Sequence, residues 1–277
     1  MEIPFCTLRD VVELPAYWRG SARARRQLPP HRRLAYGPHP RQYALLLEPR
    51  GVASETPLPW AVYLHGGAWT FGTPEAFRPA ARAWLAAGFR VLLPSYRRPP
   101  RVTLGGIVED CWMALEYAAA FAERTGRPLG PVQVGGISAG GHLAALLALQ
   151  PSRWGAAGWP AGPHRALLCA APTDFSILRP RPLFSRRKAQ DPLQQLEEAR
   201  EVEWLLLHGK NDGMVAYAHS LHFARALRER EAAVELVTIP KGGHLASGRW
   251  TYDAQDAYAH TVATFIRQGL GGLRGRG

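Results

Sequence analysis

The sequence predicts an α/β fold in which a mostly parallel, doubly wound sheet carries helices on both faces. Short apolar runs alternate along the chain with longer segments of helical spacing, and glycine or proline marks most of the joins between them. Alternation of this kind is typical of α/β domains. At 277 residues, with 47% hydrophobic and 20% charged side chains, the chain has the size and the apolar content for one such domain.

The predicted strands are short apolar runs, as is usual for strands that a parallel sheet buries on both faces. They are Tyr43–Leu47, Trp60–His65, Phe89–Leu93, Pro131–Gly135, Ala166–Ala170, Val202–His208 and Val234–Ile239. The predicted helices are Pro74–Ala87, Ile107–Glu123, Ser138–Gln150, Ala216–Arg230 and Thr251–Gln268. In such a sheet the ligand site lies beyond the carboxyl ends of the strands, so reactive residues are expected just after a strand.

The domain organisation follows from the same pattern. Residues 1–40 are rich in proline and arginine and only weakly periodic, which indicates a short helix and loop that cover the domain. Residues 41–277 contain no repeat and no linker, so we expect a single domain there. Within it, residues 172–196 carry proline, arginine and phenylalanine without clear periodicity. This stretch is either a small lid over the site or an irregular loop.

The formal net charge of +12 comes largely from arginine, with one cluster near the N-terminus and a second formed by Arg179, Arg181, Arg186 and Arg187. Clusters of this kind attract acidic partners, but no nucleic-acid-binding motif accompanies them. We therefore interpret them as solvated surface and expect no nucleic-acid partner.

The N-terminal residues lack the basic start and apolar stretch of a secretory signal, and no apolar run is long enough to span a membrane. The expectation is a soluble, cytoplasmic protein without a membrane partner. Cys6, Cys111 and Cys169 are widely spaced and odd in number, which predicts neither a disulfide framework nor a metal site. The oligomeric state has no sequence signal.

A Gly-x-Ser-x-Gly segment, Gly136-Ile137-Ser138-Ala139-Gly140, follows a predicted strand and opens a predicted helix. A strand, a tight turn and a helix are the context in which such a serine serves as a nucleophile, with its Oγ projecting over the sheet. Bulky side chains at Gly136 and Gly140 would collide with the neighbouring strand and helix. The segment alone also fits a capping serine in a glycine-rich turn, so its partners decide the interpretation.

The predicted strand at 60–65 runs into His65-Gly66-Gly67-Ala68-Trp69, which is suited to an oxyanion loop. Small residues let backbone N–H groups approach the oxygen of a tetrahedral intermediate. Gly67 and Ala68 are the first candidates in the loop, Gly66 stays open, and Ala139, directly after the serine, supplies the remaining donor. His65 is expected to shape the loop rather than to act as a base. Trp69 either lines the substrate pocket or packs.

Asp212 and His244 are the candidate acid and base. Asp212 lies in the turn after the strand at 202–208, and His244 lies on a glycine-rich loop after the strand at 234–239. An acid in this place holds an imidazole in the tautomer that accepts a proton. The order Ser, Asp, His differs from the two common protease orders. Asp174 is the rival acid. Packing or surface roles are expected for His142, His219 and His222.

At these residues the chain resembles the α/β-hydrolase superfamily. The resemblance rests on His65-Gly66-Gly67-Ala68-Trp69, on Gly136-Ile137-Ser138-Ala139-Gly140-Gly141-His142 and on His208-Gly209-Lys210-Asn211-Asp212. Over residues 35–270 the chain is most similar to carboxylesterases of the hormone-sensitive-lipase and kynurenine-formamidase-like groups. The resemblance implies Ser138 as nucleophile, His244 as base and Asp212 as its orienter, and it implies no metal or organic cofactor. Ala68 and Ile137 depart from the hormone-sensitive-lipase pattern, which leaves the substrate open.

The leading hypothesis is hydrolysis of a carboxylic ester of a small acyl substrate through an acyl-enzyme. The same triad would serve an aryl formamidase or a thioesterase, and only the pocket would differ. A hydrolase fold retained as a binding protein is the third possibility, against which the complete triad argues.

Overall fold

The computed structural model describes residues 8–178 and 188–271, and an eight-stranded sheet runs through its centre. The strand order is β1-β2-β4-β3-β5-β6-β7-β8. β2 is antiparallel to both of its neighbours, β1 and β4, and all other pairings are parallel. The strands are β1 (His31–Ala35), β2 (Tyr43–Leu47), β3 (Trp60–Leu64), β4 (Arg90–Pro94), β5 (Val132–Ile137), β6 (Arg165–Cys169), β7 (Glu203–Gly209) and β8 (Val234–Ile239).

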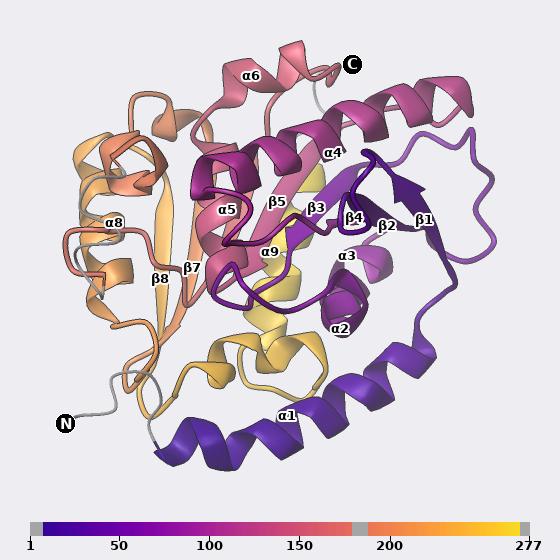
Figure 1. Cartoon of the computed structure of the whole chain (residues 1–277). Coiled ribbons are helices and arrows are strands. Elements are labelled where there is room, and N and C mark those ends of the chain that lie inside the picture. The colour runs from indigo at the N-terminus through magenta and orange to yellow at the C-terminus, as the bar shows by residue number, and fades with distance from the viewer. Residues whose placement is uncertain (1–7, 179–187, 272–277) are drawn as a thin grey trace.

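Helices cover both faces of this sheet (Figure 1), with α4, α5, α6 and α8 on one face and α3 and α9 on the other. The α-helices are α1 (Leu8–Gln27), α2 (Pro74–Phe77), α3 (Ala81–Ala86), α4 (Leu104–Arg124), α5 (Ala139–Ala148), α6 (Pro151–Ala156), α8 (Ala218–Glu229) and α9 (Ala259–Gly271). The 3₁₀ helices are η1 (Arg78–Ala80), η2 (Lys188–Gln190), η3 (Pro192–Gln194), η4 (Ala199–Glu201) and η5 (Leu245–Thr251).

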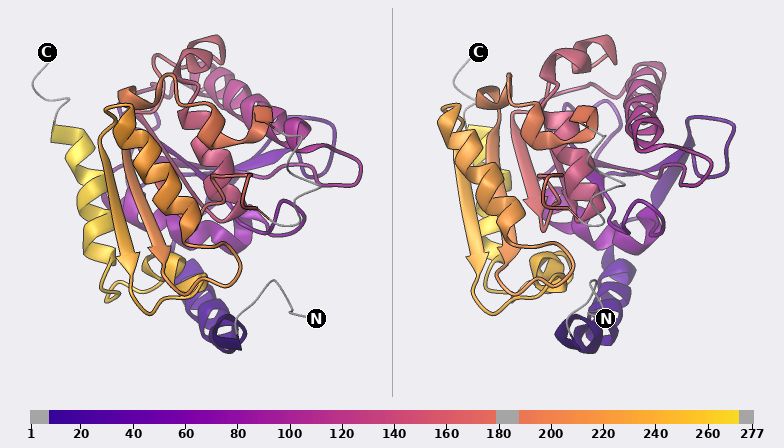
Figure 2. Two further views of the ribbon diagram at one scale, coloured as in Figure 1. Left: turned by 90° about the vertical axis from the view of Figure 1, so that its left-hand side faces the viewer. Right: turned by 60° about the vertical axis from the view of Figure 1, so that its left-hand side comes forward.

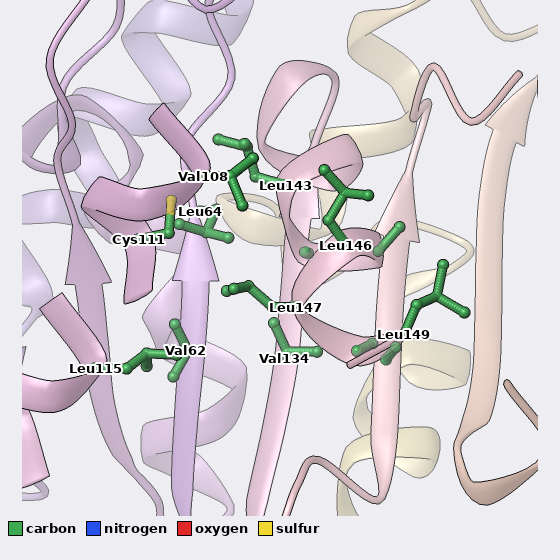
Figure 3. Packing of buried hydrophobic residues seen from close by; sticks show 14 of the residues in the cluster. Val62, Leu64, Val108, Cys111, Leu115, Val134, Leu143, Leu146, Leu147 and Leu149 are labelled. Atoms are coloured by element: carbon green, nitrogen blue, oxygen red, sulfur yellow. The ribbon is translucent and has the colours of Figure 1, made fainter. Parts of the chain in front are cut away.

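The two hydrophobic cores follow from the period-two alternation of strand side chains. Along β3, the buried residues Trp60, Val62 and Leu64 belong to the core under α4 and α5. Ala61 and Tyr63 belong to the core under α3 and α9. Figure 3 shows the first core from close by, with leucines of α5 next to Val62, Leu64 and Val134. Because both faces are buried, the strands read as continuous apolar runs in the sequence.

The predicted α/β architecture is confirmed, and every predicted strand is present with its ends shifted by at most a few residues. The sequence missed β1. Four of its five side chains are exposed and only Leu34 is buried, so it carries no apolar run. β1 pairs with β2 at the edge of the sheet. The predicted domain boundary at residue 40 is therefore wrong, because His31–Ala35 belongs to the sheet.

Three helical predictions also need correction. The helix expected at 74–87 is divided into α2, the 3₁₀ helix η1 and α3. The helix expected at 251–268 is split into η5, which ends at Thr251, and α9, which begins at Ala259. Turns occupy the residues between them. The short helix expected within residues 1–40 is the 20-residue α1. Helix α6 lies in a stretch for which no element was predicted, and Pro151 occupies its first turn.

Helix α1 lies across the end of the sheet toward which the arrows of β7 and β8 point (Figures 1 and 2). Its buried residues Tyr17, Ser21 and Ala24 recur at helical spacing and face the domain, and Leu28, directly after the helix, is buried as well. The ring of Tyr17 packs edge-on against Tyr252, with ring centroids 5.3 Å apart. Helix α1 therefore sits over the carboxyl ends of the strands.

The stretch 172–196 lies partly outside the described residues, which omit 179–187 and with them the second arginine cluster. Its described part packs against α5. The ring of Phe175 stacks on His142 at a centroid distance of 5.1 Å. His142 Nε2 lies 2.7 Å from the carbonyl oxygen of Gln190. Within the described ranges, no helix combines the length and the apolar character needed to cross a membrane.

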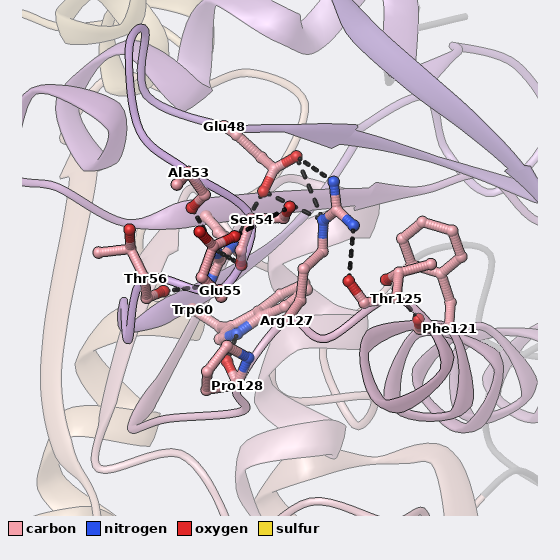
Figure 4. Close-up of polar contacts among 11 residues, drawn as sticks. Glu48, Ala53, Ser54, Glu55, Thr56, Trp60, Phe121, Thr125, Arg127 and Pro128 are labelled. Atoms are coloured by element: carbon pink, nitrogen blue, oxygen red, sulfur yellow. Dashed lines mark hydrogen bonds and ion pairs between the residues drawn. The ribbon is translucent and has the colours of Figure 1, made fainter.

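A buried ion network ties the sheet to its loops at the opposite end (Figure 4). Arg90, fully buried on β4, donates its Nε to Glu48 Oε1 at 2.9 Å and its Nη1 to the carbonyl of Thr56 at 3.0 Å. Arg127 Nη2 lies 3.1 Å from Glu48 Oε2. Figure 4 shows these two side chains in contact. One carboxylate therefore neutralises two arginines that are shielded from water.

Glu48→Ala is expected to lower the free energy of unfolding by about 3 kcal/mol, because it leaves two buried guanidinium groups without their counter-charge. Urea denaturation followed by circular dichroism measures the effect. Glu55→Ala, in the same loop region but exposed, is the matched control and should leave the midpoint unchanged. Equal midpoints for Glu48→Ala and the native protein would show that the network contributes nothing to stability.

Candidate active site

Ser138 occupies the single residue between β5 and α5, with φ 56° and ψ −127°. Non-glycine residues rarely adopt this backbone conformation, and strain of this kind gathers at functional sites. The flanking glycines make the turn possible. A Cβ on Gly136 would lie 2.3 Å from the carbonyl oxygen of Gly140, and one on Gly140 would lie 2.0 Å from that of Leu64. The predicted steric reason for these two glycines is therefore confirmed.

Ser138 opens into a cavity of about 300 Å³ beneath α1. Helix α1 contributes one face, the loop after β3 a second, and the loop around His244 a third. The lining residues are Asp10, Leu14, Tyr17, Trp18, Gly66, Gly67, Ala68, Phe71, Phe77, Ile137, Ser138, Met214, His244 and Leu245. Most of them are apolar. Asp10, Ser138 and His244 supply polar side chains to the lining.

The loop after β3 turns sharply beside Ser138. Gly67 has φ 123°, Ala68 φ 46° and Trp69 φ 62°. A Cβ on Gly67 would lie 2.1 Å from the carbonyl oxygen of Phe71, so only glycine fits this close approach. Within residues 8–178 and 188–271, the N–H groups of Gly67, Ala68 and Ala139 have no hydrogen-bond acceptor in the protein. All three N–H groups are thus available to an external acceptor.

Trp69, a candidate for substrate binding, packs instead. Its indole N–H donates to His142 Nδ1 at 3.3 Å, and the two rings meet edge-on. The side chain also contacts the core under α4 and α5. The cavity at Ser138 is lined by its neighbours Gly67 and Ala68, so the structure favours the packing alternative for Trp69. His65 contacts the loop, since its Nδ1 lies 2.8 Å from the carbonyl oxygen of Gly66, and its ring stacks on Tyr96 at 4.4 Å.

Asp212 and His244 lie in direct contact. His244 Nδ1 donates to Asp212 Oδ2 at 2.7 Å, and both side chains are at most 5% exposed. The other carboxylate oxygen, Oδ1, accepts the backbone N–H groups of Met214 and Val215, each at 2.8 Å. The turn thus fixes the carboxylate, and the carboxylate fixes the ring. With Nδ1 engaged, Nε2 is the nitrogen left to exchange a proton in the cavity that His244 shares with Ser138.

The protonation of this pair is strongly coupled. Burial alone would raise the pKa of Asp212, but the positive charge of His244 and hydrogen bonds from His208 and His244 hold it well below its usual range. Burial alone would lower the pKa of His244. Asp212 outweighs this through its charge and its hydrogen bond, and Asp10 adds to the effect, so the pKa of His244 lies above its ordinary value.

The rival acid Asp174 binds a different histidine. Its Oδ2 lies 2.7 Å from His222 Nδ1, and its Oδ1 accepts the backbone N–H of Ser176 at 2.9 Å. His219, one turn earlier on α8, accepts the N–H of Asp174 through Nδ1 at 3.2 Å. These groups form a separate cluster, so the geometry brings His244 together with Asp212 and not with Asp174.

Two residues at the site were not identified from the sequence. His208 Nε2 lies 3.1 Å from Asp212 Oδ2, the same oxygen that His244 contacts, and His208 Nδ1 lies 2.7 Å from Ser220 Oγ. The sequence signal for this contact was the position of His208 near the end of β7, four residues before Asp212. Asp10 Oδ1 accepts the backbone N–H of His244 at 2.7 Å. A separation of 234 residues leaves no local signal for this contact.

The described residues contain no group of three histidine, cysteine, aspartate or glutamate side chains arranged to hold a metal ion. In the same part of the chain, Cys111 and Cys169 are buried and form no disulfide.

Comparison with known proteins agrees with this architecture. Residues 61–222 match a family described as having the alpha/beta hydrolase fold. The carboxylesterase NlhH of Mycobacterium tuberculosis is 36% identical over 93 residues, which cover 33% of this chain and 29% of NlhH. The alignment therefore spans less than a third of that relative. Esterase LipC of the same species is 25% identical over 96% of this chain and 75% of its own length.

Solved structures share the whole fold. Esterase 2 of Thermogutta terrifontis has a TM-score of 0.71 at 21% identity, with 89% of this chain and 96% of that chain covered. Esterase B of Lactobacillus rhamnosis has a TM-score of 0.72 at 20% identity, with 95% and 97% covered. The family match covers more than half of the chain and includes the strand that leads to Ser138. The chain belongs to the family of proteins with the alpha/beta hydrolase fold.

Proposed function

We propose that the protein hydrolyses carboxylic esters, with Ser138 as nucleophile, His244 as general base and Asp212 as the acid that orients the base. The observation that carries the proposal is the contact of His244 Nδ1 with Asp212, 2.7 Å long, beside a cavity that Ser138 and His244 both line. A serine on a strained turn, an oriented imidazole and unused N–H donors are the parts that acyl transfer requires.

In the first half of the reaction, Ser138 Oγ attacks the acyl carbon while His244 Nε2 takes the hydroxyl proton. Asp212 stabilises the imidazolium that forms. The carbonyl oxygen becomes an oxyanion, which accepts hydrogen bonds from Ala139 N–H and from Gly67 or Ala68 N–H. Each such donor contributes about 3–4 kcal/mol to the stability of the transition state. Collapse of the intermediate breaks the ester C–O bond, and His244 returns its proton to the departing alkoxide.

In the second half, water attacks the acyl-enzyme and His244 accepts its proton. The same N–H groups bind the second oxyanion. Breakdown of this intermediate returns the proton to Ser138 Oγ and releases the carboxylic acid. The two half-reactions use one base and one oxyanion site, so no further group is needed to close the cycle.

The shape and lining of the cavity support a small, uncharged ester as substrate. Its volume is about 300 Å³, the lower end of the range for small-molecule sites. Leu14, Trp18, Phe71, Phe77 and Leu245 offer apolar contacts. No lysine or arginine is among the described lining residues, so transfer of a substrate carboxylate into this apolar lining costs free energy. The lining therefore favours short acyl esters over the charged amino-acid portion of an aryl formamide such as N-formylkynurenine.

The test is labelling with a fluorophosphonate probe, mapping of the adduct by mass spectrometry, and turnover of a panel of esters, acyl thioesters and N-formylkynurenine. We expect one adduct on Ser138 and highest turnover for short-chain esters. An adduct on another serine would reassign the nucleophile. An unlabelled, inactive protein would support the binding-protein alternative.

A further inference from the structure

The helix that covers the cavity also contacts the loop that carries the base. Asp10, in the first turns of α1, is 1% exposed. Its Oδ1 accepts the backbone N–H of His244 at 2.7 Å, within the range of charge-assisted hydrogen bonds. The same carboxylate lines the cavity that holds Ser138. One side chain of the cover is thus in contact with both the base and the substrate space.

The loop is shaped to receive this carboxylate. Gly243, directly before His244, faces Asp10, and a Cβ at this position would lie 2.3 Å from Asp10 Oδ1. Backbone N–H groups on glycine-rich loops are held weakly unless something binds them, because glycine adds conformational freedom. The hydrogen bond from His244 to Asp10 supplies this restraint. His244 is therefore held at two points, by Asp212 through its ring and by Asp10 through its backbone.

We propose that Asp10 is a positioning residue for His244, so that helix α1 is part of the catalytic apparatus and not only a cover. The proposal rests on the proposed ester hydrolysis, because it assigns Asp10 a role through the base of that reaction.

Two properties of His244 depend on Asp10 in this arrangement. The hydrogen bond fixes the loop, and the negative charge favours the protonated ring, adding to the larger effect of Asp212 on the pKa of His244. Other charged or titratable groups near this loop are Lys241 on the loop itself, Glu13 on α1, Arg249 on η5 and His208, which contacts the carboxylate of Asp212. Among the charged groups, Asp212 and Asp10 are the ones that raise the pKa of His244.

The test is the pH profile of kcat/KM on p-nitrophenyl acetate, a substrate that does not ionise in the range of interest. A base is active when neutral, so the native rate should rise with pH through the pKa of His244, above 6.5. Asp10→Asn preserves the acceptor oxygen and removes the charge, so its rising limb should move to lower pH. Asp10→Ala removes both, and its plateau should also fall by about 10- to 100-fold, the usual scale for a hydrogen bond to a charged group.

Glu13→Gln is the matched control, since it removes one negative charge from the same helix only three residues away. The pH profile of kcat/KM for Glu13→Gln should coincide with that of the native protein. Equal shifts for Glu13→Gln and Asp10→Asn would overturn the proposal by tracing the effect to overall charge. An unshifted Asp10→Asn profile would also overturn it.

Gly243→Ala tests the contact from the other side. Its Cβ should displace the carboxylate and lower the plateau in the native background. In the Asp10→Ala background the clashing oxygen is gone, so the same change should cost much less. Equal losses in both backgrounds would contradict the proposed contact. Fluorophosphonate labelling of Ser138 in every variant separates this result from a failure of the proposed function, which would abolish labelling in the native protein as well.

Discussion

Replacement of Ser138 by alanine is expected to lower kcat for a short-chain ester by about 10⁶-fold, the scale seen when the nucleophile of a catalytic triad is removed. The change takes away the oxygen that forms the acyl-enzyme and leaves the rest of the site in place. The residual rate should come from the N–H groups at Gly67, Ala68 and Ala139, which still stabilise an oxyanion formed by attack of water.

The fold should tolerate this change. Serine and alanine both carry a Cβ, so the backbone at position 138, with φ 56° and ψ −127°, is under the same steric strain with either residue. Thermal unfolding of the variant should match that of the native protein. Ser152→Ala, at an exposed serine on α6, serves as the matched control and should be fully active. Turnover by Ser138→Ala within tenfold of the native rate, taken with an unchanged fold, would exclude Ser138 as nucleophile.

The sequence was informative where burial and backbone geometry constrain residue type. Strands β3, β5, β6 and β7 are buried on both faces, so their apolar runs stand out, and their order alone predicts a parallel sheet. Gly136 and Gly140 are fixed by contacts shorter than any side chain permits. Because the carboxyl ends of parallel strands meet at one edge, residues placed just after strands converge. That rule was sufficient to bring Asp212 and His244 together.

The features that the sequence did not reveal depend on contacts between distant residues. β1 has an exposed, basic sequence, and it becomes a strand because β2 offers an unpaired edge. The guanidinium of Arg33 lies 3.3 Å from the ring centroid of Tyr43, a contact that exists only in the paired sheet. The roles of Asp10 and Trp69 also depend on contacts with distant residues. The neighbouring sequence of Asp10 or of Trp69 carries no pattern that specifies those contacts.

Replacement of Asp212 by asparagine is expected to lower kcat/KM by about 10⁴-fold, because it should leave His244 in the wrong tautomer. The reason lies in the turn. Oδ1 accepts two backbone N–H groups, from Met214 and Val215, so the amide oxygen of an asparagine should take this place. The amide NH₂ group then takes the place of Oδ2 and faces His244 Nδ1. A donor there requires Nδ1 to accept, so the ring proton moves to Nε2 and the ring no longer accepts the proton of Ser138.

The steady-state rates of Asp212→Asn and Asp174→Asn on one short-chain ester measure this effect against a matched control. The second variant has the same chemical change at the neighbouring acid, which binds His222 instead of His244. It should retain near-native activity at a pH where both proteins are folded by circular dichroism. A large loss in Asp174→Asn with little loss in Asp212→Asn would assign the role of acid to Asp174. Comparable losses in both would point instead to a general dependence on charge at this edge of the sheet. The geometry favours neither of these outcomes, because Asp212 alone of the two carboxylates contacts the ring that shares a cavity with Ser138.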